Sequence, residues 1–330
     1  MKEPRTLMEA IEYFSDAEIA FEEAKNLRFP NGVHCPTCGR ADVRFISTRK
    51  MWECKEKHAK RQFSAKLGTI MEDSALPYKV WFAALWTIAN DKNGISSYEF
   101  ARMTGITQKS AWHVLHRCRL AMKVGGIGGG PGQLEGTVEI DETFIGGKPK
   151  NMHKAKRERN LRRSGSHQRE KIGVAGVLKR TSEQALSHVR LNVVWQTTTA
   201  AMATGALLPF IRENVKPGSE IMGDSLPAYT GLRADYTLET VNHSAEEYVR
   251  GRVHNNGMEN FWSLLKRTFG GTYVSVEPFH LSRYLDEQAW RFNERKLDDG
   301  QRFRKLASAI VGLRLTWKEL TGYEDAGAAA

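Results

Sequence analysis

Short apolar runs alternate with longer amphipathic stretches in the second half of the chain, a pattern typical of a mixed α/β domain. Val138 and Ile140 alternate with Glu139 and Asp141, which predicts a half-buried strand. The same pattern predicts strands at 136–145, 171–179, 186–195, 219–223 and 236–241. Apolar residues at helical spacing predict helices at 198–214, 257–269 and 280–295.

The first half of the chain is helical on both sides of a segment rich in cysteine and histidine. Helical patterns cover 7–28 and 76–122, and a glycine-rich stretch at 125–132 has the composition of a flexible linker. The sequence therefore predicts an α/β multidomain protein. Its expected parts are N-terminal helices at 1–30, a zinc ribbon at 31–72, a helix-turn-helix module at 73–124, a linker at 125–133, a catalytic domain at 134–300, and a C-terminal helix with a disordered tail at 301–330.

Two capping signals within the helical part predict a helix-turn-helix. Ser96 and Glu99 form a capping box, Gly105 suits a left-handed turn, and Thr107 can cap a second helix that runs to Met122. The start of that second helix is where such modules meet base edges. The residues expected to be exposed there for DNA contact are Gln108, Lys109, Trp112 and His113. A small helical bundle that binds nothing is the alternative.

Three cysteines and a histidine have the spacing of a structural zinc site. Cys35-Pro-Thr-Cys38 forms one half-site, and Cys54 with His58 follows sixteen residues after Cys38. Three thiolates and an imidazole are typical of a closed tetrahedral site, so one structural Zn²⁺ is expected. His34 competes with His58 for the fourth position, and a redox-active cysteine pair is the alternative reading. Cys118, the remaining cysteine, lies inside a helical pattern and is expected in the core.

Three acidic residues have the arrangement of a two-metal centre. Asp141 and Asp224 each follow a short apolar run, and Glu259 shares one helix face with Ser263 and Lys266. Two such aspartates and a helical glutamate can bind two Mg²⁺ ions, or two Mn²⁺ ions. A metal pair of this kind promotes attack on a phosphodiester. Taken singly, these acids, like Glu139 and Glu142 beside Asp141, could be solvated surface groups, and Glu259 with Lys266 could be a surface ion pair.

The charge distribution favours a polyanionic partner. The chain carries a formal charge of +11 over 330 residues, and ten lysines and arginines crowd between 148 and 171. The cations expected to contact double-stranded DNA are Arg157, Arg162, Arg163, Lys266 and Arg267. No apolar run is long enough for a membrane helix, and the N-terminus lacks the apolar core of a signal peptide. With few cysteines, these features predict a cytoplasmic protein without a membrane partner.

Several motifs resemble those of bacterial insertion-sequence transposases of the group numbered fifteen-ninety-five. They are Cys35-Pro-Thr-Cys38-Gly, residues 62–74, Val138-Glu-Ile-Asp-Glu-Thr-Phe-Ile-Gly-Gly147, residues 261–267 and residues 284–293. The resemblance implies a ribonuclease-H-like fold for 134–297, Mg²⁺-dependent cleavage at transposon ends, and joining of the 3′-hydroxyl to target DNA. Asp141, Asp224 and Glu259 match the family's three acids, and Lys266 matches the lysine after them.

The third acid is the position at which this family varies. Some members carry asparagine or histidine instead, and His254, Asn255 and Asn256 stand just before Glu259. We therefore expect a transposase that acts on transposon ends and target DNA as a homodimer or higher assembly, associated with the bacterial nucleoid. The alternatives are a zinc-dependent DNA-binding protein without strand-transfer activity and a nuclease of the same fold.

Overall fold

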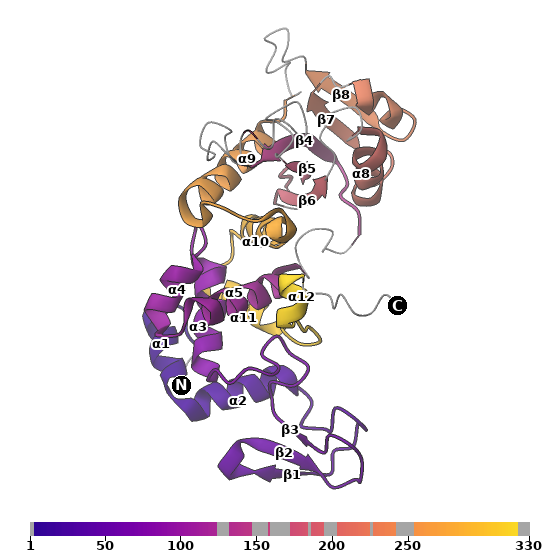
Figure 1. The fold of residues 1–330 in the computed structure, drawn as a ribbon. Coiled ribbons are helices and arrows are strands. Elements are labelled where there is room, and N and C mark those ends of the chain that lie inside the picture. Colours follow the sequence, from indigo (N-terminus) through magenta and orange to yellow (C-terminus); the bar gives the residue numbers. More distant parts are fainter. Residues whose placement is uncertain are drawn as a thin grey trace. The chain divides into compact units, whose positions relative to one another are not determined.

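A computed structural model describes residues 3–123, 132–146, 158, 172–183, 186–194, 203–224, 227–241 and 254–322. The chain forms two compact units, whose elements are labelled in Figure 1. Unit 1 combines residues 1–122 with 294–330, and unit 2 comprises residues 123–293. Within the described ranges, no helix has the length and apolar character needed to cross a bilayer.

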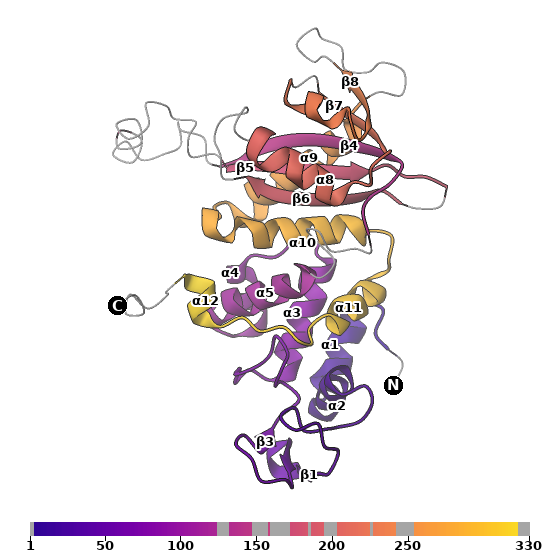
Figure 2. The ribbon, with the colours of Figure 1, turned by 90° about the vertical axis from the view of Figure 1, so that its right-hand side faces the viewer.

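Unit 1 is helical and is built around α3 (Tyr78–Asn90), in which nine of the thirteen residues are buried. Phe82 of α3 stacks on Phe14 with ring centroids 4.3 Å apart. Phe303 completes this aromatic cluster from the far end of the sequence and lies 5.3 Å from Trp86. The other helices are α1 (Leu7–Ser15), α2 (Ala17–Arg28), α4 (Ser97–Thr104), α5 (Gln108–Met122), α11 (Asp299–Ser308) and α12 (Trp317–Thr321). Figure 2 shows α11 beside α3.

A small antiparallel sheet carries the cysteine-rich segment of unit 1. Its strands are β1 (Val43–Ile46), β2 (Met51–Cys54) and β3 (Gln62–Phe63), in the order β1-β2-β3. Trp52 of β2 packs against Phe21 of α2 and against Phe29, at centroid distances of 5.6 and 5.8 Å. The sheet thus shares an aromatic core with the N-terminal helices rather than standing alone.

The predicted turn between α4 and α5 is confirmed in its local detail. The Ser96 hydroxyl accepts the Glu99 N–H at 3.1 Å, which is one of the two hydrogen bonds of the predicted capping box, and Gly105 ends α4 with φ of 72°. The Thr107 hydroxyl accepts the Ser110 N–H at 3.2 Å and so caps α5.

Unit 2 is a five-stranded mixed sheet covered on both faces. Its order is β6-β5-β4-β7-β8, with β4 antiparallel to β5, β5 antiparallel to β6, and β4, β7 and β8 parallel. The strands are β4 (Thr137–Ile145), β5 (Ile172–Lys179), β6 (His188–Val194), β7 (Glu220–Asp224) and β8 (Thr237–Val241). All five predicted strands are confirmed, and their bounds differ from prediction by one or two residues.

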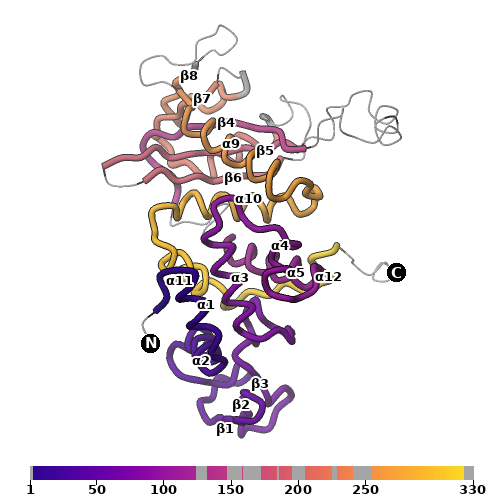
Figure 3. The backbone as a smooth tube through the Cα atoms, turned by 90° about the vertical axis from the view of Figure 1, so that its left-hand side faces the viewer, coloured from indigo at the N-terminus to yellow at the C-terminus, as the bar shows by residue number. Residues whose placement is uncertain are grey.

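Helices cover both faces of the sheet, and each face has its own apolar core. A π-helical turn (Ala203–Leu207) and α8 (Leu208–Asn214) pack on the face that contains Val138 and Ile140. The opposite face carries α9 (Asn256–Thr268), which continues into a second π-helical turn (Phe269–Tyr273), and α10 (Leu281–Asn293). Figure 3 shows α9 and α10 beside β4, β5 and β6. All three helices were predicted, although 198–202 lie outside the described residues.

Candidate active site and zinc site

The pairing of β4 with β7 brings two of the predicted acids to the same level. Glu139 pairs with Met222, and continuing this register by two residues brings Asp141 level with Asp224. Neighbouring strands lie roughly 4.8 Å apart, and residues two positions apart share a face. Because Ile140 and Ile221 point into the core beneath α8, both aspartates belong to the face that carries α9.

A glycine lets α9 approach that face closely. Gly176 of β5 pairs with Asp141, and a Cβ at this position would lie 2.4 Å from Met258 Cε and 2.9 Å from the Trp262 ring. The close approach allows the Trp262 indole N–H to donate to Asp141 Oδ2 at 3.0 Å. Trp262 belongs to the apolar stripe that predicted the helix at 257–269, and its contact with Asp141 was not predicted. A glycine inside a strand was the signal that could have indicated this close contact.

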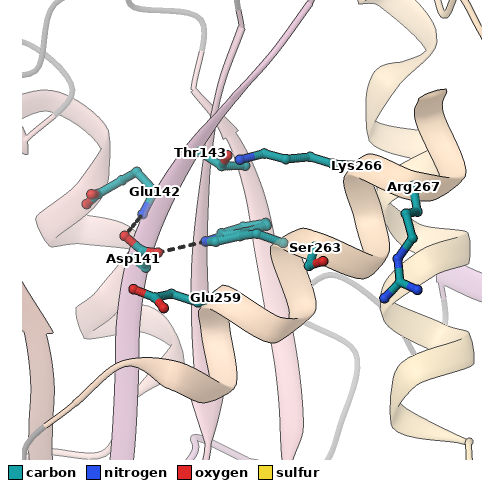
Figure 4. A pocket seen from close by; sticks show the side chains of 8 residues that line it. Asp141, Glu142, Thr143, Glu259, Ser263, Lys266 and Arg267 are labelled. Carbon is teal, nitrogen blue, oxygen red and sulfur yellow. Dashed lines mark hydrogen bonds between the residues drawn. The ribbon is translucent and has the colours of Figure 1, made fainter. Parts of the chain in front are cut away.

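A cavity of about 570 Å³ opens where α9 meets β4. Its lining residues are Asp141, Glu142, Thr143, Glu259, Trp262, Ser263, Lys266 and Arg267. Figure 4 shows the Glu259 carboxylate pointing toward Asp141 and Lys266 reaching toward Thr143, whereas Arg267 points away from Asp141. The predicted face of Glu259, Ser263 and Lys266 therefore lines one cavity together with the first aspartate.

The two asparagines that competed with Glu259 lie elsewhere. Asn255 is 3% exposed, Asn256 is exposed at the start of α9, and neither lines the cavity. The geometry favours Glu259 over both as the partner of Asp141.

Burial and like charge make this site electrostatically costly. Burial, together with the neighbouring Glu259 and Asp224, raises the pKa of Asp141 from 3.8 to about 6, although hydrogen bonds from the Glu142 N–H and Trp262 oppose the shift. Burial also raises the pKa of Glu142 to about 7, while the Tyr229 hydroxyl donates to its carboxylate. A cation placed between these carboxylates would relieve their repulsion.

The four predicted zinc ligands converge in unit 1. The ligand atoms of Cys35, Cys38, Cys54 and His58 all lie within 4.8 Å of one another, and no other group of three or more such residues in the described ranges is as compact. The Cys35 Sγ–His58 Nε2 distance is 3.4 Å and the Cys38 Sγ–Cys54 Sγ distance is 3.6 Å. A tetrahedron with zinc–sulfur bonds of about 2.3 Å has edges of roughly 3.5–3.8 Å, so these spacings fit Zn²⁺.

Hydrogen bonds prepare two of these ligands for a metal. Burial alone would raise the pKa of the Cys35 thiol, but the N–H groups of Cys38 and Thr37 and the neighbouring thiols lower it to about 6. The His58 Nδ1 lies 2.6 Å from the Ala59 carbonyl, which leaves Nε2 facing the cysteines. The competing His34 instead lies 3.1 Å from the Gly32 carbonyl, outside the cluster, and Cys118 is buried in α5 as expected.

The expected exposure at the start of α5 is wrong for three of four residues, and only Lys109 is fully exposed. Trp112 and His113 are half-buried because Trp317 of α12 lies against them, with ring centroids 5.7 and 5.5 Å away. The Lys109 ammonium lies 4.4 Å above the same Trp317 ring. Gln108 is half-buried because its amide donates to the Ser97 hydroxyl.

The predicted DNA contacts Arg157, Arg162 and Arg163 belong to the basic segment and lie outside the described residues. Lys266 and Arg267, at the end of α9, both line the cavity beside Asp141.

We expect one Zn²⁺ per chain, and we expect Cys38→Ser to lose it because three ligands hold the metal poorly. Zinc measured by atomic emission on purified protein tests this, with Cys118→Ala as the matched control that keeps its zinc. A metal content near zero in the unsubstituted protein, with the 31–71 segment still resistant to protease, would rule out the zinc site.

We expect Asp141→Asn to stabilise the Mg²⁺-free protein above pH 6. The folded-state pKa of Asp141 lies above its value of 3.8 in the unfolded chain, so the folded state binds the extra proton between about pH 4 and 6. Stability is therefore lost as pH rises through this window, and the ionised group remains a cost above it. Allowing for partial exposure, the gain should be on the order of 1–2 kcal/mol at pH 8, and absent at pH 3.5.

Urea denaturation at both pH values measures this gain. Glu135→Gln, which replaces an exposed acid paired with Lys216, is the control and should gain nothing. A less stable Asp141→Asn at pH 8 would contradict the proposed crowding of carboxylates.

Known proteins match both parts of this architecture. Residues 133–293 match the ISXO2-like transposase domain, and residues 15–59 match the transposase zinc-ribbon domain. The chain is 27% identical, over 78% of its own length and 85% of the relative's, to an uncharacterized protein in transposable element ISH50 of Halobacterium salinarum. It is 30% identical, over 32% of its length and 84% of the relative's, to an uncharacterized transposase-like protein of Haemophilus influenzae. No solved structure matches it.

The chain belongs to the insertion-sequence transposase family that joins a zinc ribbon to an ISXO2-like transposase domain.

Proposed function

We propose that this protein binds the ends of an insertion sequence, cleaves the DNA there, and joins the freed 3′-hydroxyl to target DNA. The observation that carries the proposal is the meeting of Asp141, level with Asp224 on neighbouring parallel strands, with Glu259 from α9. These are the three positions at which the family resemblance expects the catalytic acids.

The sheet topology supports a ribonuclease-H-like catalytic domain. Three consecutive antiparallel strands are followed by two parallel ones, and β4, the first in sequence, lies at the centre. In this arrangement Asp141, midway along β4, is level with Asp224 at the C-terminal end of β7. The predicted catalytic range of 134–300 remains part of this proposal.

The donor set fits a pair of Mg²⁺ ions. Carboxylate oxygens are the ligands that this cation prefers, and burial, with a smaller contribution from Glu259 and Asp224, raises the pKa of Asp141. Asp141, Asp224 and Glu259 would hold the metals, which activate the attacking oxygen and stabilise the leaving one. The indole of Trp262 orients Asp141 by its hydrogen bond, so that one Asp141 oxygen is fixed by the protein.

Cations around this cavity suit the DNA backbone. Lys266 extends from α9 into the cavity that Asp141 lines, and Arg267 stands at its margin. We place phosphates of the DNA end against Lys266, and we assign nonspecific backbone contact to Arg157, Arg162 and Arg163 of the basic segment. The start of α5, with Lys109 exposed, is proposed to read the end sequence together with Trp317 of α12.

We expect Asp141→Asn, Asp224→Asn and Glu259→Gln each to reduce strand transfer at least 100-fold in Mg²⁺, because a neutral amide holds a hard cation poorly. Asn256→Ala should keep activity within about threefold, since Asn256 lies outside the cavity. Oligonucleotide joining assays, with DNA binding measured in parallel, test this. Unchanged joining by Glu259→Gln beside a dead Asn256→Ala would transfer the third ligand to the asparagine.

The same assays separate a transposase from a DNA-binding protein without strand-transfer activity. If the unsubstituted protein binds ends in Mg²⁺ and Mn²⁺ yet never cleaves them, the proposal fails and the second function replaces it.

We expect Lys109→Ala and Lys266→Ala to weaken DNA binding in different ways. Loss of Lys266 should weaken cognate and scrambled ends alike and reduce the slope of log K against log salt by about 1. Loss of Lys109 should weaken cognate ends more than scrambled ones. Binding titrations across salt measure both, with Lys216→Ala as the control, because Lys216 is an exposed cation paired with Glu135. Equal losses for cognate and scrambled DNA in Lys109→Ala would contradict a reading role for α5.

A further inference from the structure

A second carboxylate on β4 lies completely inside unit 2. Glu139 precedes Asp141 by two residues on the same face of the strand, and it is 1% exposed. Its Oε2 accepts the N–H of Met258 at 2.8 Å, in the first turn of α9. Glu139 therefore acts as an N-terminal cap that reaches α9 from the sheet, where the positive end of the helix favours a carboxylate.

The surroundings of Glu139 are built to receive this charge. Arg180, which follows β5, donates from Nε to Glu139 Oε1 at 2.7 Å and from a terminal nitrogen to the His254 carbonyl at 2.6 Å. Arg180 thus ties the residues just before α9 to the same carboxylate. A Cβ at position 257 would lie 2.7 Å from Glu139 Oε2, so glycine at this position permits the contact.

Glu139 and Asp141 together hold α9 at two points. Residues two apart on a strand are roughly 6.7 Å apart, and residues four apart on a helix rise by about 6 Å. The two acceptors on β4 therefore match two donors on α9, which are the Met258 N–H and the Trp262 indole N–H. One hydrogen bond would let the helix swing, whereas two fix both its position along β4 and its rotation.

Glu259 is the residue next to Met258, so its direction depends on this attachment. We infer that Glu139, supported by Arg180, is a positioning residue that sets Glu259 against Asp141 and thereby completes the metal site. The inference rests on the proposed function, since it concerns how that site holds a divalent cation. Glu139 itself touches neither DNA nor metal in this assignment.

Mn²⁺ binding to the full-length protein, followed by electron paramagnetic resonance of the free ion, tests the inference without any DNA reaction. Glu139→Ala should raise the Kd for Mn²⁺ about tenfold, as losses of groups that support metal ligands do. Glu139→Gln keeps an oxygen acceptor for the Met258 N–H and should stay within about threefold. Glu135→Ala, which removes an exposed acid of the same unit, is the control and should bind as the unsubstituted protein does.

A double-mutant cycle distinguishes positioning from general loss of structure. If Glu139 acts through Glu259, then Glu139→Ala adds nothing to the weakened Mn²⁺ binding of Glu259→Gln. A further tenfold loss in that background would overturn the inference. So would Glu139→Ala binding as tightly as the unsubstituted protein while Glu259→Gln binds weakly. Mn²⁺ binding unaffected by Glu259→Gln would instead contradict the proposed function.

A second variant covers the case in which Glu139→Ala does not fold. Gly257→Ala leaves the carboxylate in place but pushes a methyl group against it, so it should weaken Mn²⁺ binding by a similar factor. Gly271→Ala is the matched control, because a Cβ there meets nothing within 4 Å. Normal Mn²⁺ affinity in Gly257→Ala would overturn the inference independently.

Discussion

The packing of α9 against β5 over Gly176 is the contact on which the proposed catalytic site depends. Met258 and Trp262 fill the space that a side chain at 176 would take, and the apolar core of this face forms around them. Burial of Phe261 and Leu265 along the same stripe supplies the stabilisation, on the order of 2 kcal/mol for each large side chain. Because this helix is held so closely, the polar residues on its other side face β4 at a fixed distance.

The close packing of α9 brings several carboxylates together, and neighbouring groups offset part of the electrostatic cost. Glu139 is buried but meets the guanidinium of Arg180 and a helix N-terminus. Asp141 has only the indole of Trp262 and a backbone N–H against the repulsion of Glu259 and Asp224. Two acids on one face of one strand therefore differ in role. Glu139, whose charge is balanced by Arg180, holds the helix. Asp141, which has no cationic partner of this kind among the described residues, remains available to bind a cation.

Local patterns in the sequence were sufficient to predict most of the helices and strands and the candidate zinc ligands. Alternation in 136–145 and the apolar stripe of 257–269 each depend on a single segment, and both predictions are confirmed. The candidate zinc ligands could be predicted for the same reason, since the two members of each pair are only a few residues apart in the sequence. By contrast, the role of Glu139 could not be predicted, because its partners Met258 and Arg180 come from two other segments that only the sheet register brings near.

The start of α5 was mispredicted for a related reason. A helix-turn-helix pattern describes two helices, whereas the face of α5 is covered by residues about 200 positions later. His113 and Arg117 both lie within hydrogen-bonding distance of the Leu315 carbonyl, and Trp317 then lies on Trp112. A pattern that is complete between Ser96 and Met122 contains no information about such a partner.

The packing of the C-terminal segment into unit 1 has a consequence for folding. Unit 1 draws its core from both ends of the chain, because Phe303 closes the aromatic cluster of Phe14 and Trp86. Arg117 is buried, and it donates to the carbonyls of Ile70, Glu72 and Leu315. A buried guanidinium that loses one of these acceptors is destabilising. Until residues 294–322 are made, unit 1 therefore lacks part of its core and one acceptor of Arg117, whereas unit 2 is continuous in sequence and can fold as soon as it emerges. The helices proposed to read DNA are thus completed only after the unit that is proposed to cleave it.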